Sequence, residues 1–234
     1  MSQMIRFKRP DGKECSGFYA EPAAGTKAPA IVALQEWWGL NDQIKGVAAR
    51  LAAAGYRALV PDLYRGSVTV EAKEAEHLMQ GLNFGEAASQ DIRGAVQHLK
   101  QSSAKVGITG FCMGGALTIL SACRVPEADA AVAWYGCPPL EYLEAEKIGM
   151  PLMGHWAIED AHFKIEQVDA LEQRLMAARV KYEFHRYHAQ HSFANEMAAH
   201  ELEVNPGIAI KYDPIAAENA WQRTMSFFKQ HIAG

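Results

Sequence analysis

The segment ITGFCMGGA at residues 108–116 constrains the fold more than any other part of the chain. Its first half is apolar and predicts a buried strand, and its second half begins a helix at Met113. Cys112 occupies the apex of the turn between them, in the pattern Gly-x-nucleophile-x-Gly that is typical of a nucleophile elbow. Gly110 and Gly114 lack a Cβ, so the strand and the helix can approach closely. The sequence therefore predicts a strand–turn–helix unit built around one thiol.

The position of Cys112 has a chemical consequence. A sharp turn of this kind strains the backbone of its apical residue. The helix that follows directs its free N–H groups and its positive dipole end at that residue. We therefore expect the thiol of Cys112 to gain thiolate character beside donors that can hold an oxyanion. The alternative is a buried, unreactive cysteine in an ordinary glycine-rich turn, and the short motif alone leaves both open.

Predicted strands and helices alternate along the chain. We expect strands at residues 4–8, 14–20, 30–34, 57–60, 106–109, 130–134, 151–155 and 181–186. We expect helices at residues 42–54, 71–80, 85–101, 113–125, 140–146, 163–178 and 214–231, and a short helix at 194–201. Asp11-Gly12 marks a hairpin between the first two strands, and residues 22–29 form a connector rich in Pro, Gly and Ala. The last helix is expected to turn Trp221, Met225 and Phe228 inward.

This alternation predicts an α/β fold in one domain over residues 1–234, with a mostly parallel central sheet flanked by helices on both faces. The formal net charge is −4, which argues against a nucleic-acid-binding surface. No apolar run approaches the roughly 18 residues of a membrane span. The four cysteines show no metal-finger spacing and no C-x-x-C pair, and we expect no signal peptide, because the first residues contain no apolar core before a cleavage site. We therefore expect a cytoplasmic protein with reduced thiols, a monomer or a small homo-oligomer, that acts on a small molecule.

Polar residues follow four of the predicted strands, at the sheet edge where open α/β proteins bind ligands. Glu36, Cys112, Asp160 and His191 each come soon after one of these strands. Nucleophile, acid and histidine also occur in the chain order that α/β-hydrolases use. We interpret His191 as the general base for the thiol, and Asp160 as the group that orients the imidazole.

Each of these assignments has an alternative. His191 could be a solvated loop histidine, or it could form a metal-binding H-x-x-H pair with His188, although no third ligand with zinc-site spacing is apparent. Glu159 competes with Asp160 for the orienting role, and Asp160 could instead cap the helix that follows. We expect no metal and no organic cofactor.

Glu36 comes just after a buried strand, where an ionised carboxylate is costly unless it is paired. One interpretation is a salt bridge to an arginine such as Arg65, and the other is an active-site carboxylate that contacts the thiol. The next residues, Trp37 and Trp38, are expected at the mouth of a pocket or in the core. The backbone N–H groups of Trp37 and Met113 are the candidate oxyanion donors.

Further motifs are spread over nearly the whole chain. They are QEWWGLN at 35–41, PDLY at 61–64, GFCMGGA at 110–116, WYG at 134–136, ED at 159–160 and HSF at 191–193. Together, and in this order, they resemble the dienelactone hydrolase family of α/β-hydrolases, in which a cysteine replaces the commoner serine. The resemblance implies a fold without an inserted lid domain and a triad of Cys112, Asp160 and His191. It also implies that Glu36 interacts with the resting thiol and helps to activate it when substrate arrives.

The resemblance further implies hydrolysis of an ester or lactone through a thioester, as in the conversion of dienelactone to maleylacetate. The residues expected around the substrate are Trp38, Tyr64, Tyr135, Phe193 and Arg65. Dienelactone hydrolases bind the substrate carboxylate with two arginines. One follows the His-Ser-Phe segment, where this chain has Ala194-Asn195-Glu196. The other comes from the helical region after Pro-Asp-Leu-Tyr, and the corresponding residues 71–92 of this chain contain no arginine. The alternatives are another ester class, such as aryl esters or phosphotriesters, a redox thiol protein, and a non-catalytic module that binds a small molecule.

Overall fold

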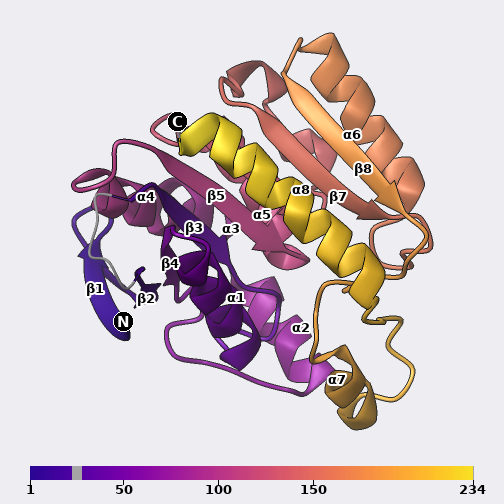
Figure 1. Cartoon of the computed structure of the whole chain (residues 1–234). Coiled ribbons are helices and arrows are strands. Elements are labelled where there is room, and N and C mark those ends of the chain that lie inside the picture. The colour runs from indigo at the N-terminus through magenta and orange to yellow at the C-terminus, as the bar shows by residue number, and fades with distance from the viewer. Residues whose placement is uncertain (23–27, 234) are drawn as a thin grey trace.

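An eight-stranded sheet runs through the protein (Figure 1). The computed structural model describes residues 1–22 and 28–233, so most of the connector expected at residues 22–29 lies outside the described residues. The strands are β1 (Ser2–Lys8), β2 (Glu14–Ala20), β3 (Ala30–Leu34), β4 (Arg57–Pro61), β5 (Val106–Phe111), β6 (Ala130–Trp134), β7 (Leu152–Ala157) and β8 (Tyr182–Tyr187). They lie in the order β1-β2-β4-β3-β5-β6-β7-β8.

The sheet is antiparallel at one edge and parallel elsewhere. β1 and β2 form the predicted hairpin, with Phe7 opposite Cys15, and β2 is antiparallel to β4. All other neighbouring strands pair in parallel. Every residue of β3, β5, β6 and β7 is buried, because helices cover both faces of these central strands. The predicted α/β fold with a mostly parallel sheet is confirmed.

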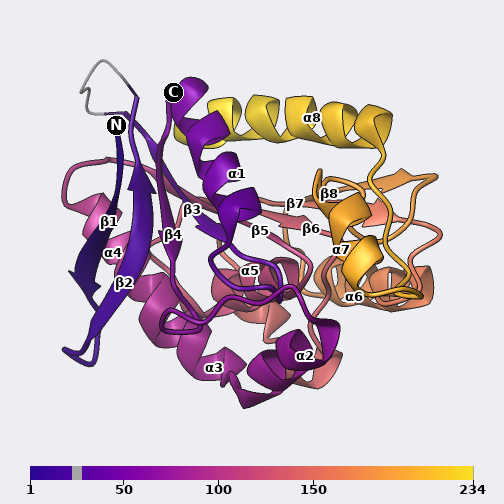
Figure 2. The ribbon, with the colours of Figure 1, turned by 90° about the horizontal axis from the view of Figure 1, so that it is seen from below.

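Two layers of helices enclose the sheet (Figure 2). The helices are α1 (Asp42–Ala53), α2 (Ala72–Gly81), α3 (Phe84–Glu86), α4 (Arg93–Lys100), α5 (Met113–Arg124), α6 (Ile165–Ala177), α7 (Ala198–Val204) and α8 (Pro214–Ile232). Ile31 and Ala33 of β3 pack with α1 and α8. Val32 and Leu34 of the same strand pack with α4 and α5 on the opposite face, where α6 covers β7. The two-residue period of the strand therefore divides the core into two halves.

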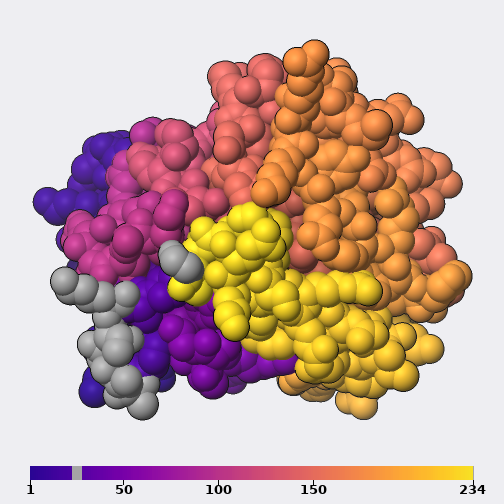
Figure 3. All heavy atoms as spheres, turned by 45° about the horizontal axis from the view of Figure 1, so that its top comes forward, coloured from indigo at the N-terminus to yellow at the C-terminus, as the bar shows by residue number. Residues whose placement is uncertain are grey.

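Helix α8 lies across one face of the sheet, and its atoms cover the middle of that face in Figure 3. We expected Trp221, Met225 and Phe228 on its inner side. Phe228 is fully buried, but Trp221 and Met225 are only partly buried. Ala220 and Thr224 take the other inner positions, because their small side chains let the helix lie close to the strands.

Two predicted helices are divided in the structure. Residues 84–100 form α3, a π-helical segment (Ala87–Ile92) and α4, and the π-helical segment carries the buried Asp91. The helix expected at 140–146 is two 3₁₀ turns, Leu140–Tyr142 and Ala145–Lys147, because the backbone between them is extended. Within residues 1–22 and 28–233, no helix combines the length and the apolar character that crossing a membrane requires.

Candidate active site

Cys112 lies at the bend between β5 and α5. Its φ and ψ are 54° and −117°, which is the strained apical conformation that the motif predicts. The Cys112 N–H donates to the Trp134 carbonyl at 3.0 Å and fixes the bend. A Cβ on Gly110 would lie 2.2 Å from the Gly114 carbonyl oxygen, and a Cβ on Gly114 would lie 2.5 Å from the Leu34 carbonyl oxygen. Glycine at both positions therefore lets β5, α5 and β3 meet at this point.

The surroundings of Cys112 favour the thiol over the thiolate. Burial and the carboxylate of Glu36 raise the pKa of this thiol well above its ordinary value, and the Met113 N–H at the start of α5 lowers the pKa by less. The expected thiolate character is therefore wrong for the resting site, since burial and a negative charge outweigh the helix terminus. Cys112 is nevertheless partly exposed, whereas the other three cysteines are buried.

His191 and Asp160 form a buried pair. His191 Nδ1 lies 2.8 Å from Asp160 Oδ2, and the two residues are 3% and 6% exposed. Asp160 Oδ1 accepts hydrogen bonds from the backbone N–H groups of His162 and Phe163, at 2.8 and 2.9 Å. Asp160 thus contacts the histidine and also stabilises the turn before α6, so the two roles considered for it coexist. The competing Glu159 is exposed.

Aromatic rings enclose the imidazole of His191. Its ring centre lies 4.8 Å from that of His162, 5.2 Å from that of Tyr135 and 5.6 Å from that of Phe163. These contacts contradict the alternative of a solvated loop histidine. The other half of the H-x-x-H pair, His188, is exposed. Across the residues that the structure describes, no three His, Cys, Asp or Glu side chains gather closely enough to hold a metal ion.

Glu36 is buried just after β3 and hydrogen-bonded by two side chains. The Tyr135 hydroxyl donates to Glu36 Oε1 at 3.1 Å, and Asn195 Nδ2 donates to Oε2 at 2.8 Å. Burial and the neighbouring carboxylate of Glu201 raise the pKa of Glu36 to about 8. The salt bridge considered between Glu36 and Arg65 is not formed, and Glu36 instead acts on the charge of the thiol.

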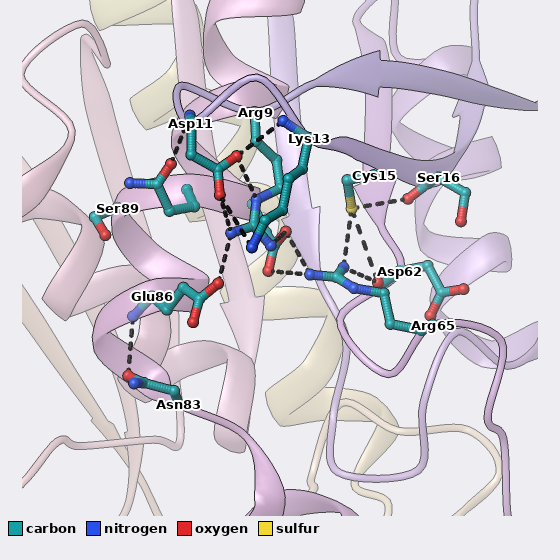
Figure 4. Close-up of polar contacts among 12 residues, drawn as sticks. Arg9, Asp11, Lys13, Cys15, Ser16, Asp62, Arg65, Asn83, Glu86 and Ser89 are labelled. Atoms are coloured by element: carbon teal, nitrogen blue, oxygen red, sulfur yellow. Dashed lines mark hydrogen bonds and ion pairs between the residues drawn. The ribbon is translucent and has the colours of Figure 1, made fainter.

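The exposed Arg65 belongs to a separate ion network that also includes Arg9 (Figure 4). Its Nη2 donates to both carboxylate oxygens of Asp91 at 2.7 and 2.9 Å, and its Nη1 donates to the Asp62 carbonyl at 2.9 Å. Arg9 Nη1 donates to the same Asp91 at 3.2 Å. The expectation that Arg65 contacts the substrate is therefore wrong, because Asp91 of the π-helical segment holds its guanidinium.

A cavity of about 220 Å³ lies beside the thiol. It is lined by Trp37, Trp38, Met79, Cys112, Met113, His162, Phe163, His191, Ser192 and Ile210. Three further residues expected around the substrate, in addition to Arg65, do not line it. Tyr135 and Phe193 are fully buried, and the Tyr64 hydroxyl contacts Sδ of Met113 at 3.2 Å. Their motifs bring the backbone near the site, but their rings pack into the core.

The sequence did not predict several residues of the site. Met79, Phe163 and Ile210 come from three separate segments, and an apolar residue there is equally typical of the core. Asn195 had a signal, because it stands just after the His-Ser-Phe segment, where an arginine was expected from the resemblance. Its side chain accepts the Met197 N–H at 2.8 Å, which forms a turn and makes α7 begin later than predicted.

The strand order, with Cys112 at the bend after β5 and His191 after β8, is that of an α/β-hydrolase. The sequence model of the dienelactone hydrolase family matches residues 15–232. The chain therefore belongs to the dienelactone hydrolase family, which confirms the resemblance and places it among the hydrolases of carboxylic ester bonds.

Individual relatives resemble the chain over its whole length. Protein usf of Aquifex pyrophilus is 30% identical over 243 residues, covering 99% of this chain and 100% of the relative. A candidate carboxymethylenebutenolidase of Aquifex aeolicus is 30% identical over 244 residues, with 99% and 100% covered. The crystal structure of a candidate dienelactone hydrolase from Klebsiella pneumoniae aligns with a TM-score of 0.81 at 25% identity, covering 98% of this chain and 99% of that one.

Proposed function

We propose that the protein hydrolyses neutral esters or lactones, with Cys112 as nucleophile, His191 as general base and Asp160 as the residue that orients the histidine. One observation supports this most strongly. The partly exposed thiol and the imidazole of a buried His–Asp pair line the same cavity. A nucleophile and an oriented base that face one cavity are what covalent catalysis of acyl transfer requires.

The first half-reaction forms a thioester. Asp160 accepts Nδ1–H of His191, which leaves Nε2 free to take a proton. Nε2 takes the thiol proton of Cys112 as the sulfur attacks the carbonyl carbon of the substrate. The backbone N–H groups of Trp37 and Met113 hold the negative charge that develops on the carbonyl oxygen. The bond to the leaving oxygen then breaks, and His191 gives that oxygen the proton.

The second half-reaction releases the acid. A water molecule replaces the alcohol, and His191 Nε2 removes one of its protons as the oxygen attacks the thioester carbonyl. The same N–H groups hold the second oxyanion. The carbon–sulfur bond breaks, Cys112 recovers a proton from His191, and the carboxylic acid leaves. One ester and one water thus give one acid and one alcohol.

Glu36 sets the charge next to the nucleophile. Because its pKa is raised to about 8, this carboxyl holds its proton in most molecules at neutral pH. Ionisation of Glu36 raises the pKa of Cys112, and so it disfavours attack. The proton on Glu36 therefore permits the transient thiolate that the reaction needs.

The pocket favours a neutral, apolar acyl group. Met79, Phe163 and Ile210 give it apolar walls, and among the described residues no Lys or Arg lines it. Asn195 donates to Glu36 and presents no positive charge to a ligand. An anionic substrate would bring another negative charge to a site that already holds buried acids. A substrate carboxylate therefore finds no Lys or Arg among the described residues that line the cavity.

The nucleophile is tested with a small p-nitrophenyl ester. Cys112→Ala should abolish both the burst and the steady turnover, whereas Cys123→Ala, a buried cysteine on α5, should keep both. Circular dichroism checks that each variant is folded. Turnover by Cys112→Ala at the wild-type rate would contradict the proposal, and binding without any burst in the wild type would favour a non-catalytic module.

The substrate class is tested with a matched pair of lactones. One carries a free carboxylate, and the other is its methyl ester. The methyl ester should show the higher kcat/KM, mainly through a lower KM, because no Lys or Arg of the described residues lines the cavity to bind the acid. A higher kcat/KM for the free acid would contradict the neutral substrate class and leave the nucleophile assignment untouched.

A further inference from the structure

Two buried carboxylates of the site meet at one amide. Asn195 Nδ2 lies 2.8 Å from Glu36 Oε2, and 3.0 and 3.1 Å from the two carboxylate oxygens of Glu201. Glu36 follows β3 and Glu201 belongs to α7, and each is 3% exposed. Asn195 Oδ1 accepts the Met197 N–H at 2.8 Å, so the amide is oriented with its NH₂ group toward both acids.

Among the described residues, no Lys or Arg compensates the charge of this acid pair, and only the exposed His200 lowers the pKa of Glu201 through its charge. The titratable and hydrogen-bonding groups that act on it are Trp38, Cys112, Tyr135, Asn195 and His200. Asp160 acts on Cys112, and His191 packs against Tyr135. His191 is held by Asp160, and His200 is exposed with Nδ1 3.7 Å from Glu203. No Lys or Arg of the described residues forms an ion pair with Glu36, and none with Glu201.

We propose that Glu36 and Glu201 share one proton at neutral pH, and that Glu201 is thereby a positioning residue that keeps the carboxyl beside Cys112 uncharged. Two adjacent carboxylates without a cation do not both ionise readily, because each charge disfavours the other. The proton resides mainly on Glu36. Both carboxylate oxygens of Glu201 lie within hydrogen-bond distance of Asn195 Nδ2, which can share one N–H between them, and Trp38 gives Glu201 a further hydrogen bond. These donors favour the ionised form of Glu201.

A shared proton predicts an unusual effect of substituting Glu201. Glu201→Gln removes the negative charge that keeps the proton on Glu36, so Glu36 ionises at a lower pH. An ionised Glu36 raises the pKa of Cys112, so the thiol becomes less reactive at neutral pH. Removal of an acid ordinarily has the opposite effect on a nearby thiol, because it lowers the pKa of that thiol. A slower reaction of the Cys112 thiol in Glu201→Gln therefore indicates a shared proton, whereas a faster reaction indicates that Glu201 acts on the thiol only by charge repulsion.

The experiment measures alkylation of Cys112 by iodoacetamide as a function of pH, with peptide mass spectrometry to quantify this thiol alone. In the wild type, the rate should rise with pH and show a break near pH 8, where the pair loses its proton. Glu201→Gln should shift that break at least one unit lower and react about tenfold more slowly at neutral pH. Glu203→Gln, an exposed position on the same helix, should match the wild type. A Glu201→Gln profile equal to that of the wild type, or a faster reaction, would overturn the proposal.

Infrared spectroscopy of the wild type provides a second measurement that needs no folded mutant. A protonated carboxyl band should be present at neutral pH and disappear near pH 8. Its absence at neutral pH would overturn the proposal even if Glu201→Gln does not fold. The inference rests on the proposed role of Cys112, but neither measurement uses an ester. A negative result in either measurement would overturn the shared proton but would not contradict ester hydrolysis. Conversely, loss of ester hydrolysis in Cys112→Ala would support the nucleophile assignment and would say nothing about the shared proton.

Discussion

His191 Nδ1 lies 2.8 Å from Asp160 Oδ2, although 31 residues separate them in the chain. The two residues meet because β7 and β8 are parallel neighbours, so the segments that follow them leave the same edge of the sheet. The backbone N–H groups of His162 and Phe163 fix the other oxygen of Asp160. The position of the imidazole is therefore set by the sheet and one tight turn.

Asp160→Asn should lower kcat roughly 10²- to 10⁴-fold while the protein stays folded. The amide can still accept the backbone N–H groups, but it cannot hold the tautomer that frees Nε2 of His191. Hydrolysis of a p-nitrophenyl ester measures the effect, with Glu159→Gln as the neighbouring control at an exposed position. An Asp160→Asn enzyme within a factor of two of the wild type would show that the pair is only structural.

Asp91→Asn should destabilise the protein by about 3 kcal/mol. Asp91 and Arg9 have side chains 3% and 5% exposed, so the substitution leaves a buried guanidinium with weaker partners. Urea unfolding measures the loss, and Arg6→Gln, which breaks an exposed pair with Glu14, should change stability by less than about 1 kcal/mol. Ester hydrolysis by folded Asp91→Asn should remain normal, because the network lies away from the pocket. If folded Asp91→Asn instead lost activity, the result would support the earlier expectation that Arg65 contacts the substrate.

Much of the fold could be predicted because it depends on local patterns. The buried apolar runs of β3 and β6 begin and end at the predicted residues, since helices on both faces leave no polar position within them. The bend at Cys112 was also predictable, because the backbone leaves no room for a Cβ at Gly110 or Gly114, two residues to either side.

Side-chain partners could not be predicted, because distant segments supply them. The direction of Arg65 depends on Asp91, which a π-helical segment without a sequence signature presents to it. The environment of Glu36 depends on Glu201, which is 165 residues away and joined through Asn195. The pKa of Cys112 followed burial and a neighbouring charge, and neither can be derived from the motif that identified the residue.

Gly114→Ala should destabilise the protein by about 2–3 kcal/mol and displace the nucleophile. The added Cβ would lie 2.5 Å from the Leu34 carbonyl oxygen and 2.6 Å from that of Gln35, so the helix must move away from β3. Thermal unfolding and ester hydrolysis measure the two effects. Gly46→Ala is the control, since a Cβ there meets nothing within 4 Å on the exposed side of α1 and should stabilise by about 0.5–1 kcal/mol. Equal stability of the two variants would contradict the close contact at the bend.

Glu36 should make the protein less stable as the pH rises from about 4.5 to about 8, relative to a Glu36→Gln variant. Below this window the carboxyl is protonated in both the folded and the unfolded state. Within it the unfolded chain releases the proton, while the folded protein retains it because burial raises the pKa of Glu36. The folded state then binds more protons than the unfolded state, so the free energy of unfolding falls with increasing pH. Urea unfolding of both proteins across this range measures the difference, and Glu203→Gln, an exposed acid on α7, should follow the wild type. A constant difference between wild type and Glu36→Gln from acid to alkaline pH would mean that the folded protein ionises Glu36 as readily as the unfolded chain does.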